Sequence, residues 1–173
     1  VHGRVVPSTF SSNVRLMAKL ESGEVVNGES AIGATSQPIQ GIWIEPQNAE
    51  VNPDAVAAIA EAELIIIGPG SLYTSLLPNL LVPGLADALR ASLAPKVYVC
   101  NVAEQPGETD DMSEVDHLQT LEWLSGVPMT HFLVNDHLGA IKQQPQGRMD
   151  KSWRDEIRAD LRVIEADVMD SLK

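Results

Sequence analysis

The sequence is poor in aromatic and basic residues, and both shortages limit what the protein can be. Phenylalanine, tryptophan and tyrosine make up 4% of its 173 residues, so leucine, isoleucine, valine and alanine must form the core. The 12 lysines and arginines are outnumbered by 24 aspartates and glutamates, which leaves a net charge of −12. Phosphate backbones and anionic membrane surfaces attract basic stripes. The composition therefore argues against nucleic acid or a membrane as a partner.

Cysteine and long apolar runs are also scarce. Cys100 is the single cysteine, so an intrachain disulfide is excluded. It lies in the apolar run 97–102, where we expect a buried and unreactive thiol. No apolar run approaches the length of a membrane span, and the first ten residues lack the apolar segment of a signal peptide. We therefore expect a cytoplasmic protein that is not inserted into a membrane.

Hydrophobic residues make up 44% of the chain, enough for a single α/β domain over residues 1–173. Near the start, residues 14–20 and 24–27 flank a turn that contains Gly23, which predicts a β-hairpin. From Asn52 onward, helical segments alternate with short apolar strands, which implies a mostly parallel sheet covered on both faces. The expected strands cover residues 39–44, 64–67, 96–101, 131–134 and 162–166, and the expected helices cover residues 53–62, 83–93, 113–124 and 149–161.

The segment LIIIGPGSLYTSLLPN, from Leu64 to Asn79, is the strongest candidate for a binding loop. An apolar strand leads into a Gly-Pro-Gly turn, and Ser71 stands where a helix N-cap is expected. Open α/β sheets bind ligands outside the carboxyl ends of their strands, and glycines let the backbone approach a phosphate. The first N–H groups of a helix lack internal partners and attract anions. The candidate ligand-binding residues are Gly68, Pro69, Gly70, Ser71, Tyr73, Thr74, Ser75 and Asn79.

An ordinary turn between a strand and a helix is the alternative interpretation of this loop, because glycine and serine also serve steric and capping roles there. Polar residues follow the next strand as well. Asn101, Gln105, Glu108 and Thr109 could recognise a sugar or a base beside the glycine loop, or they could simply belong to a capped loop. The pattern alone leaves both interpretations open.

An acidic cluster with one histidine comes next, at Asp110, Asp111, Asp116 and His117. Neighbouring residues on a helix point in different directions, which argues against a dedicated metal cage. A Mg²⁺ ion shared with ligand phosphates would need only one or two carboxylates. We expect a solvated, acidic helix start, and His117 as a helix-face histidine with a structural partner.

Two further features have a structural and a functional interpretation. Asn135-Asp136-His137 follows another strand, where a turn or a ligand-lining segment is expected. Trp123 lies near Leu121 and Leu124 in the expected helix 113–124, so we predict that its side chain is in the core. No nucleophile elbow or catalytic triad surrounds the hydroxyl groups of the glycine loop.

Four segments of the chain resemble the gluconeogenesis-factor branch of the CofD-like proteins. GPGSLYTSLLPNLLVPGLADAL, residues 68–89, resembles the signature of that branch. PSTFSSNVRLMAKLESGEVVNGES, residues 7–30, is similar to the strand pair before the loop. KVYVCNVAEQPGETDDMSEVDHL and FLVNDH, residues 96–118 and 132–137, resemble the segments that follow it. The resemblance covers most of the chain in the right order.

This resemblance implies a Rossmann-like three-layer α/β/α sandwich with a mostly parallel sheet, plus the β-hairpin near the start. It also implies a homo-oligomeric protein that binds a UDP-sugar such as UDP-N-acetylglucosamine, or an NAD-like dinucleotide, as a small-molecule ligand. Such a protein would be linked to carbon-source use, gluconeogenic growth and cell-wall synthesis or cell shape. No reaction is attached to that branch, so we lean against an enzyme and name no catalytic residue.

A related branch, the 2-phospho-L-lactate transferases, uses a similar loop near a diphosphate. A transferase that acts on a nucleotide-diphosphate-linked donor is therefore the alternative function. Members of that branch have an Asn-Pro step where this chain reads Ser71-Leu72-Tyr73, and this difference favours the binding branch.

The chain departs from the family because the GGTG-type glycine-rich turn and the acidic residues of the family's first half have no counterpart. The family's C-terminal strand and helix also have none. We therefore expect an internal or C-terminal-half segment of a longer domain, which holds one wall of the ligand cleft. A third hypothesis gives the segment no activity of its own, only packing or oligomerisation. The leucine-rich run 76–85 would then be contact surface or core.

Overall fold

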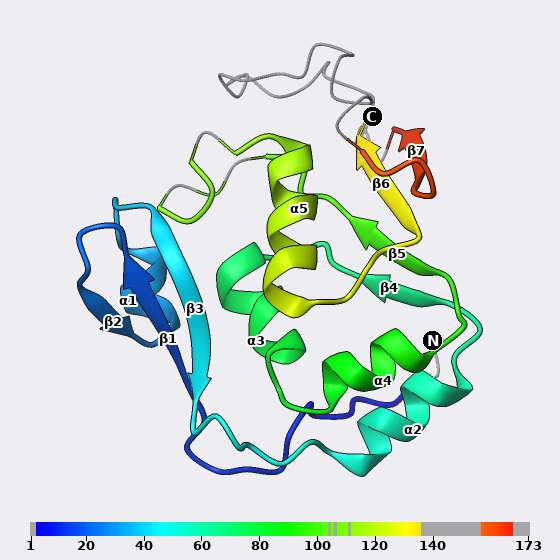
Figure 1. Cartoon of the computed structure of the whole chain (residues 1–173), viewed down its shortest axis with the longest axis horizontal. Helices are drawn as coiled ribbons and strands as arrows, with labels where there is room; N and C mark the ends of the chain where they lie inside the picture. Colours follow the sequence, from blue (N-terminus) through cyan, green and yellow to red (C-terminus); the bar gives the residue numbers. More distant parts are fainter. Residues whose placement is uncertain (1–2, 104, 106, 111, 136–156, 168–173) are drawn as a thin grey trace.

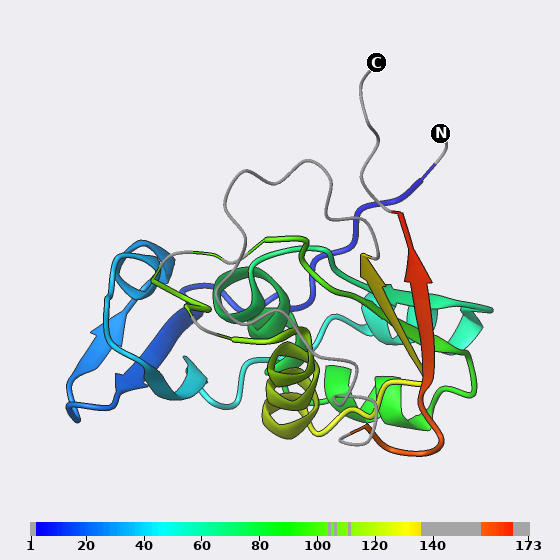
Figure 2. The same cartoon turned by 90° about the horizontal axis from the view of Figure 1, so that it is seen from above.

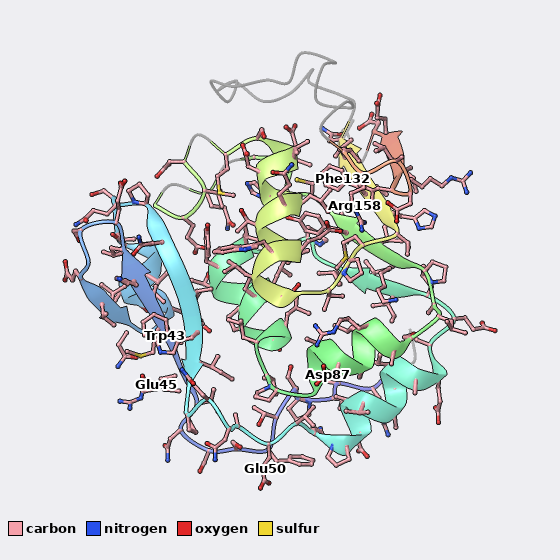
Figure 3. All side chains as sticks on the ribbon, viewed as in Figure 1. Trp43, Glu45, Glu50, Asp87, Phe132 and Arg158 are labelled. Carbon is pink, nitrogen blue, oxygen red and sulfur yellow. The ribbon has the colours of Figure 1, made fainter. Side chains whose placement is uncertain are left out.

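The predicted hairpin is present and belongs to a three-stranded antiparallel sheet at the start of the chain. A computed structural model describes residues 3–103, 105, 107–110, 112–135 and 157–167. The sheet has the order β2-β1-β3, and Gly23 adopts a φ of 86° in the hairpin turn. Trp43, on the outer face, donates from Nε1 to Glu45 Oε1 at 3.3 Å (Figure 3). The strands are β1 (Arg15–Leu20), β2 (Val25–Asn27) and β3 (Ile39–Glu45).

A short helix between β2 and β3 was not predicted. Helix α1 (Glu29–Gly33) is a single turn that begins after Gly28, whose φ is 90°. Its one buried side chain, Ile32, is fully enclosed in the core. Five residues are too few for the hydrophobic periodicity by which longer helices are recognised.

The second sheet has four strands, all parallel, and their order in space is their order in the chain. Its order is β4-β5-β6-β7, and every neighbouring pair is parallel (Figure 1). The predicted α/β class, the mostly parallel sheet and the early hairpin are thus confirmed. The strands are β4 (Ile65–Ile67), β5 (Lys96–Val99), β6 (His131–Asn135) and β7 (Arg162–Ala166).

Three predicted helices are present, with ends set by local signals. The side chain of Asn52 caps the first of them and accepts from Asp54 N at 2.9 Å. Ser113 and Asp116 form a capping box at the start of the last. The middle helix begins later than predicted, because Gly84 has a left-handed φ of 87°. These helices are α2 (Pro53–Glu61), α4 (Leu85–Ala91) and α5 (Glu114–Ser125).

The glycine loop after β4 leads into a nine-residue helical segment that starts with a π-turn. Helix η1 (Leu72–Leu76) is of the π type and α3 (Leu77–Leu80) continues it. The carbonyl of Ser71 accepts from the N–H groups of Ser75 at 3.0 Å and Leu76 at 2.9 Å. π-turns often accompany functional sites, which directs attention to this loop.

One face of the parallel sheet packs against α4 and α5 to form the core (Figure 2). The ring of Tyr98 stacks on Phe132 with centroids 5.7 Å apart, and both side chains are buried (Figure 3). The leucine-rich run 76–85 belongs to this core: its buried members are Leu77, Leu80, Val82 and Leu85, and Leu76 and Leu81 pack against them. The run is therefore core and not a contact surface.

The prediction for Trp123 is wrong, because its side chain is 75% exposed. Helix α5 buries Leu118 and Leu121. Residues two positions apart on a helix point away from each other, so a helix that buries Leu121 turns Trp123 toward solvent.

The prediction of a helix at residues 149–161 is also wrong for residues 157–161, which the structure describes. Residues 157–161 form a bend and a turn, and the other residues of the prediction lie outside the described part. Arg158 holds this turn in place: its Nη2 donates to Met129 O at 2.6 Å and pairs with Glu122 Oε1 at 3.1 Å (Figure 3). The predicted strand 162–166 follows directly and is confirmed as β7.

Candidate functional site

The glycine loop crosses the end of β5 so closely that only glycine fits at its first position. Gly68 has a φ of 88°, in the left-handed region that side chains disfavour. A Cβ atom at this position would lie 2.7 Å from the carbonyl oxygen of Val99. The carboxyl ends of β4 and β5 therefore meet at one edge of the sheet, where their arrowheads lie next to each other in Figure 1.

Asn101 clamps the loop by pairing with both backbone groups of Gly70. The N–H of Gly70 donates to Asn101 Oδ1 at 3.1 Å, and Asn101 Nδ2 donates to Gly70 O at 3.0 Å. The side-chain amide of Asn101 thus pairs with Gly70 as the backbone of a neighbouring strand would. Both backbone polar groups of Gly70 are therefore hydrogen-bonded.

Gln105 extends the clamp to the serine of the loop. Its Oε1 accepts from Asn101 Nδ2 at 3.2 Å, and its Nε2 donates to Ser71 Oγ at 2.7 Å. Ser71 precedes η1 as predicted, but its hydroxyl makes no capping bond to that helix. The reason is that the hydroxyl is engaged by Gln105, 34 residues further along the chain.

The loop that follows β5 and contains Gln105 and Glu108 also connects the glycine loop to α1, the helix between β2 and β3. Thr74 Oγ1 donates to Glu108 Oε1 at 2.7 Å, while Glu108 Oε2 is buried and has no partner among the described residues. A Cβ atom at Gly107 would lie 2.7 Å from Thr35 O and 2.8 Å from Gly33 O, at the end of α1. Glycine at position 107 thus allows the loop to lie against α1.

A pocket of about 430 Å³ opens at this edge of the sheet. Its walls combine the backbone of the glycine loop with the polar clamp and a short apolar segment that follows β5. The lining residues are Pro69, Gly70, Val99, Cys100, Asn101, Val102, Ala103 and Gln105. None of these eight side chains is basic, so a bound anion would depend on backbone N–H groups.

Four of the predicted ligand residues line the pocket: Pro69, Gly70, Asn101 and Gln105. Gly68 and Ser71 adjoin it in the same loop. Val99, Cys100, Val102 and Ala103 were not predicted to line a site, because an apolar run at the end of a strand is typical of a core. The strand ends at Val99, two residues earlier than predicted, and this early end places the apolar residues at the pocket.

The other predicted residues lie away from the lining. Tyr73 is buried, and burial raises the pKa of its hydroxyl, with a smaller contribution from the charge of Glu108. Thr109 is fully buried and accepts from Gln105 N at 3.0 Å. Ser75 and Asn79 are exposed side chains. Asn79 accepts from Ser8 Oγ and donates to Ser75 O at 2.8 Å.

The acidic cluster is used for local capping. Asp110 Oδ2 accepts from Gly107 N at 2.8 Å, and Asp116 completes the capping box of α5. Within the described residues, no three histidine, cysteine or acidic side chains are grouped to hold a metal ion. Asp111, Asp136 and His137 lie outside the described part of the chain.

Cys100 is buried as predicted, with an exposed fraction of 3%. Burial raises the pKa of its thiol to about 12, and the charge of Glu114 adds to the shift. Because the thiolate is the reactive form, Cys100 should be inert at neutral pH even though it lines the pocket.

His117 should make stability depend on pH. It is 4% exposed, and its Nδ1 has no hydrogen-bond partner in the described part of the chain, unlike the partner that we predicted. Burial lowers the pKa of its imidazole below the usual 6.5, against an opposing effect of Asp116. As the pH falls through 6.5, the unfolded state therefore takes up a proton before the folded state does.

We expect the contribution of neutral His117 to the free energy of unfolding to be complete above pH 6.5. Below that pH it should decline, by at most about 1.4 kcal/mol per pH unit. Urea unfolding at a series of pH values, for the wild type and His117→Leu, measures the effect. The variant should lose the slope just below pH 6.5. Equal slopes in the two proteins would assign the pH dependence to other groups.

Comparison with known proteins identifies the family. A family model described as 2-phospho-L-lactate transferase CofD matches residues 1–171. The chain belongs to the CofD family. The gluconeogenesis factor of Listeria monocytogenes is 49% identical over 121 residues, which are 70% of this chain and 37% of that protein. The putative gluconeogenesis factor of Thermoanaerobacterium thermosulfurigenes is 37% identical over 98% of this chain and 55% of its own length.

A solved structure of this CofD-family fold confirms the predicted fold class. A member of the UPF0052 family from Bacillus halodurans is 35% identical and superimposes with a TM-score of 0.85. The match covers 96% of this chain and 56% of that chain. The putative gluconeogenesis factor of Aquifex aeolicus is 44% identical over 135 residues, and the match covers 41% of that protein's length. The CofD-family segment described here thus spans about half the length of these relatives, or less.

No helix in the described residues has both the length and the apolar character needed to cross a bilayer.

Proposed function

We propose that this chain is part of a regulatory protein that binds a nucleotide sugar and is linked to carbon metabolism. The observation that carries the proposal is the pocket formed by the clamped glycine loop and the end of β5. It lies at the carboxyl edge of a parallel sheet, where open α/β folds bind nucleotides. The relatives named gluconeogenesis factors, together with the CofD family, support the link to carbon metabolism.

The pocket suits a ligand with one anionic part and one less polar part. The Asn101 clamp fixes the loop in advance, so a ligand would not have to order it on binding. A diphosphate would lie near Ser71 and the start of η1, where the first backbone N–H groups of the helix can approach it, because the N–H of Gly70 is already bonded to Asn101. It would avoid Thr74, because the hydroxyl there is occupied by the carboxylate of Glu108. The apolar segment formed by Val99, Val102 and Ala103 would face a sugar or a base.

We further propose that the ligand is a UDP-sugar such as UDP-N-acetylglucosamine and that the protein influences cell-wall synthesis or cell shape. Calorimetric titration of the chain with UDP-N-acetylglucosamine tests the ligand, with UDP and NAD as comparisons. Saturable binding that prefers the UDP-sugar supports the proposal. Equal binding of all three ligands would contradict the sugar specificity, and tighter binding of NAD would assign a dinucleotide instead.

Gly70→Val should weaken this binding by at least about tenfold, equivalent to about 1.4 kcal/mol, because the new side chain stands where the ligand approaches the loop. Gly70 has an ordinary φ, so the backbone tolerates the substitution, although a Cβ would lie 3.3 Å from Leu76 Cδ2. Gly41→Val is the matched control, since no atom of the described residues lies within 4 Å of a Cβ there. Unchanged affinity of a folded Gly70→Val variant would exclude the loop as the binding element.

A transferase is the second candidate, favoured by the description of the family model that matches the chain. It would transfer a phosphorus-containing group from a nucleotide-diphosphate-linked donor and would use Mg²⁺. The same samples, incubated with donor, acceptor and Mg²⁺, are analysed for product by chromatography. Formation of product would replace the regulatory proposal, and the absence of product together with tight binding would favour it.

A further inference from the structure

The polar side chains at the pocket form one continuous chain of hydrogen bonds, and the backbone sets its direction. Gly70 is the starting point, because a backbone N–H can only donate and a backbone carbonyl can only accept. The N–H of Gly70 faces one atom of the Asn101 amide at 3.1 Å, so that atom must be the oxygen. The other amide atom faces Gly70 O at 3.0 Å and must be the nitrogen. The orientation of the Asn101 amide is therefore fixed by its partners.

The amide of Gln105 is oriented in the same way. Asn101 Nδ2 uses one hydrogen for Gly70 O and directs the other at Gln105, 3.2 Å away, so the atom that receives it must be Oε1. The Nε2 group of Gln105 consequently faces Ser71 Oγ at 2.7 Å. Since an amide nitrogen donates and does not accept, Ser71 can only accept from it. The hydroxyl hydrogen of Ser71 is left for another partner.

The backbone of Gln105 is held as firmly as its side chain. Its N–H donates to Oγ1 of Thr109 at 3.0 Å, and Thr109 is fully buried. Its carbonyl accepts from the N–H groups of Glu108 and Thr109, each at 3.0 Å. Both ends of the residue are thus anchored before a ligand arrives, which lowers the entropy that binding would cost.

Two hydrogens at the border of the pocket have no acceptor within the part of the chain that the structure describes. One belongs to the Ser71 hydroxyl, and the other is the second hydrogen on Gln105 Nε2. We call these two groups the donor pair. The atoms that carry the hydrogens are 2.7 Å apart, and Gln105 lines the pocket. One oxygen, or two oxygens of one phosphate, can therefore accept from both groups.

We propose that Gln105 is a positioning residue that makes Ser71 a hydrogen-bond donor, and that the donor pair binds an anionic oxygen of the ligand. The assignment of this oxygen to a phosphate rests on the nucleotide ligand proposed above. Asn101 takes no direct part, because both hydrogens of its Nδ2 are used within the chain of bonds. None of the residues that line the pocket is basic, so the anion would be held by neutral donors.

Gln105→Glu reverses the last bond of the chain while hardly changing the size of the side chain. One carboxylate oxygen can still accept from Asn101 Nδ2, but the other accepts from the Ser71 hydroxyl, whose hydrogen is then consumed within the protein. Ser71→Ala should accordingly have different effects in the wild type and in Gln105→Glu. A double-mutant cycle measures the difference, and it cancels the added charge, which is present in both proteins of the second comparison.

Binding of UDP-N-acetylglucosamine and of inorganic pyrophosphate to this chain is followed by NMR titration. In the wild type, Ser71→Ala should weaken binding by about tenfold, the effect of losing a hydrogen bond to a charged group. In Gln105→Glu the same substitution should change the affinity by less than about twofold. Gln47→Glu adds the same charge at an exposed position and should bind like the wild type. Equal effects of Ser71→Ala in the two backgrounds would overturn the proposal.

Urea unfolding of the same four proteins without ligand tests the direction of the chain of bonds separately. Ser71→Ala should lower the equilibrium constant of folding about fivefold more in Gln105→Glu than in the wild type. The reason is that a hydroxyl that donates to a carboxylate is bonded more strongly than one that accepts from an amide. Equal losses would overturn the proposal, and this comparison decides if Gln105→Glu binds too weakly to titrate.

The two probes distinguish the donor pair from the identity of the ligand. Binding of pyrophosphate that depends on Ser71, without binding of the UDP-sugar, would support the donor pair and refute the nucleotide-sugar ligand. Binding of the UDP-sugar that is unaffected by Ser71→Ala would support that ligand and overturn the donor pair. If neither probe binds to the wild type, both proposals fail.

Discussion

Gly68→Ala is expected to destabilise the protein by about 3 kcal/mol, the sum of a left-handed backbone penalty and a steric overlap. The first contribution arises because Gly68 has a φ of 88°. The second arises because a Cβ would lie 2.7 Å from the carbonyl oxygen of Val99, and a backbone atom in a sheet cannot move aside. Urea denaturation of the wild type and the variant measures the difference in the free energy of unfolding.

Gly23→Ala separates the two contributions. Gly23 has nearly the same φ, 86°, but in the described part of the chain no atom lies within 4 Å of a Cβ at that position. It should therefore cost only the backbone penalty, about 1 kcal/mol. If both substitutions cost the same, the close crossing of the loop over β5 would have no energetic consequence. The loss of ligand affinity in Gly68→Ala should exceed that in Gly23→Ala, because only the former displaces the pocket lining.

Asn101→Asp is expected to cost about 2 to 3 kcal/mol while hardly changing the size of the side chain. The substitution replaces the Nδ2 group, which donates to Gly70 O and Gln105 Oε1, with a carboxylate oxygen. Three oxygen atoms would then face one another with no hydrogen between them. The clamp should open, and affinity for the UDP-sugar should fall together with the free energy of unfolding.

The pH dependence of this variant distinguishes the lost donor from a general effect of charge. Below about pH 4 the new carboxyl group is protonated and can donate again, so the difference from the wild type should shrink. Asn27→Asp adds the same charge at an exposed position of β2 and should change stability by no more than about 0.5 kcal/mol. An equal loss in the two variants would mean that the clamp contributes nothing.

Much of the fold was predictable because its signals are local. The cap at Asn52, the turn at Gly23 and the apolar strands of the parallel sheet each depend on a few consecutive residues. The corrections concern orientation or length. Trp123 was assigned to the core by its leucine neighbours, although its spacing from Leu121 turns it outward. Helix α1 escaped prediction because a single turn has no periodicity.

The residues of the candidate site were also predicted only in part. Pro69, Gly70, Asn101 and Gln105 were predicted from their places after strands, and all four line the pocket. Three other predicted residues serve the structure elsewhere. Tyr73 is buried, Thr109 pairs with a backbone group, and Asn79 binds Ser8. Sequence distance could not separate Tyr73 from Gln105, because each lies six residues beyond the end of its strand, whereas Thr109 and Asn79 lie ten and twelve residues beyond theirs.

By itself, the sequence determined the family through the resemblance of four segments, and it determined the α/β class and the edge of the sheet at which the candidate pocket lies. For the class and the edge, turn residues and apolar periodicity are enough, because they act between near neighbours in the chain. The tertiary structure decided the rest. Asn101 reaches Gly70 across 31 residues, and Gln105 reaches Ser71 across 34. Such pairings depend on how the strands are ordered in space, and no local pattern records that order.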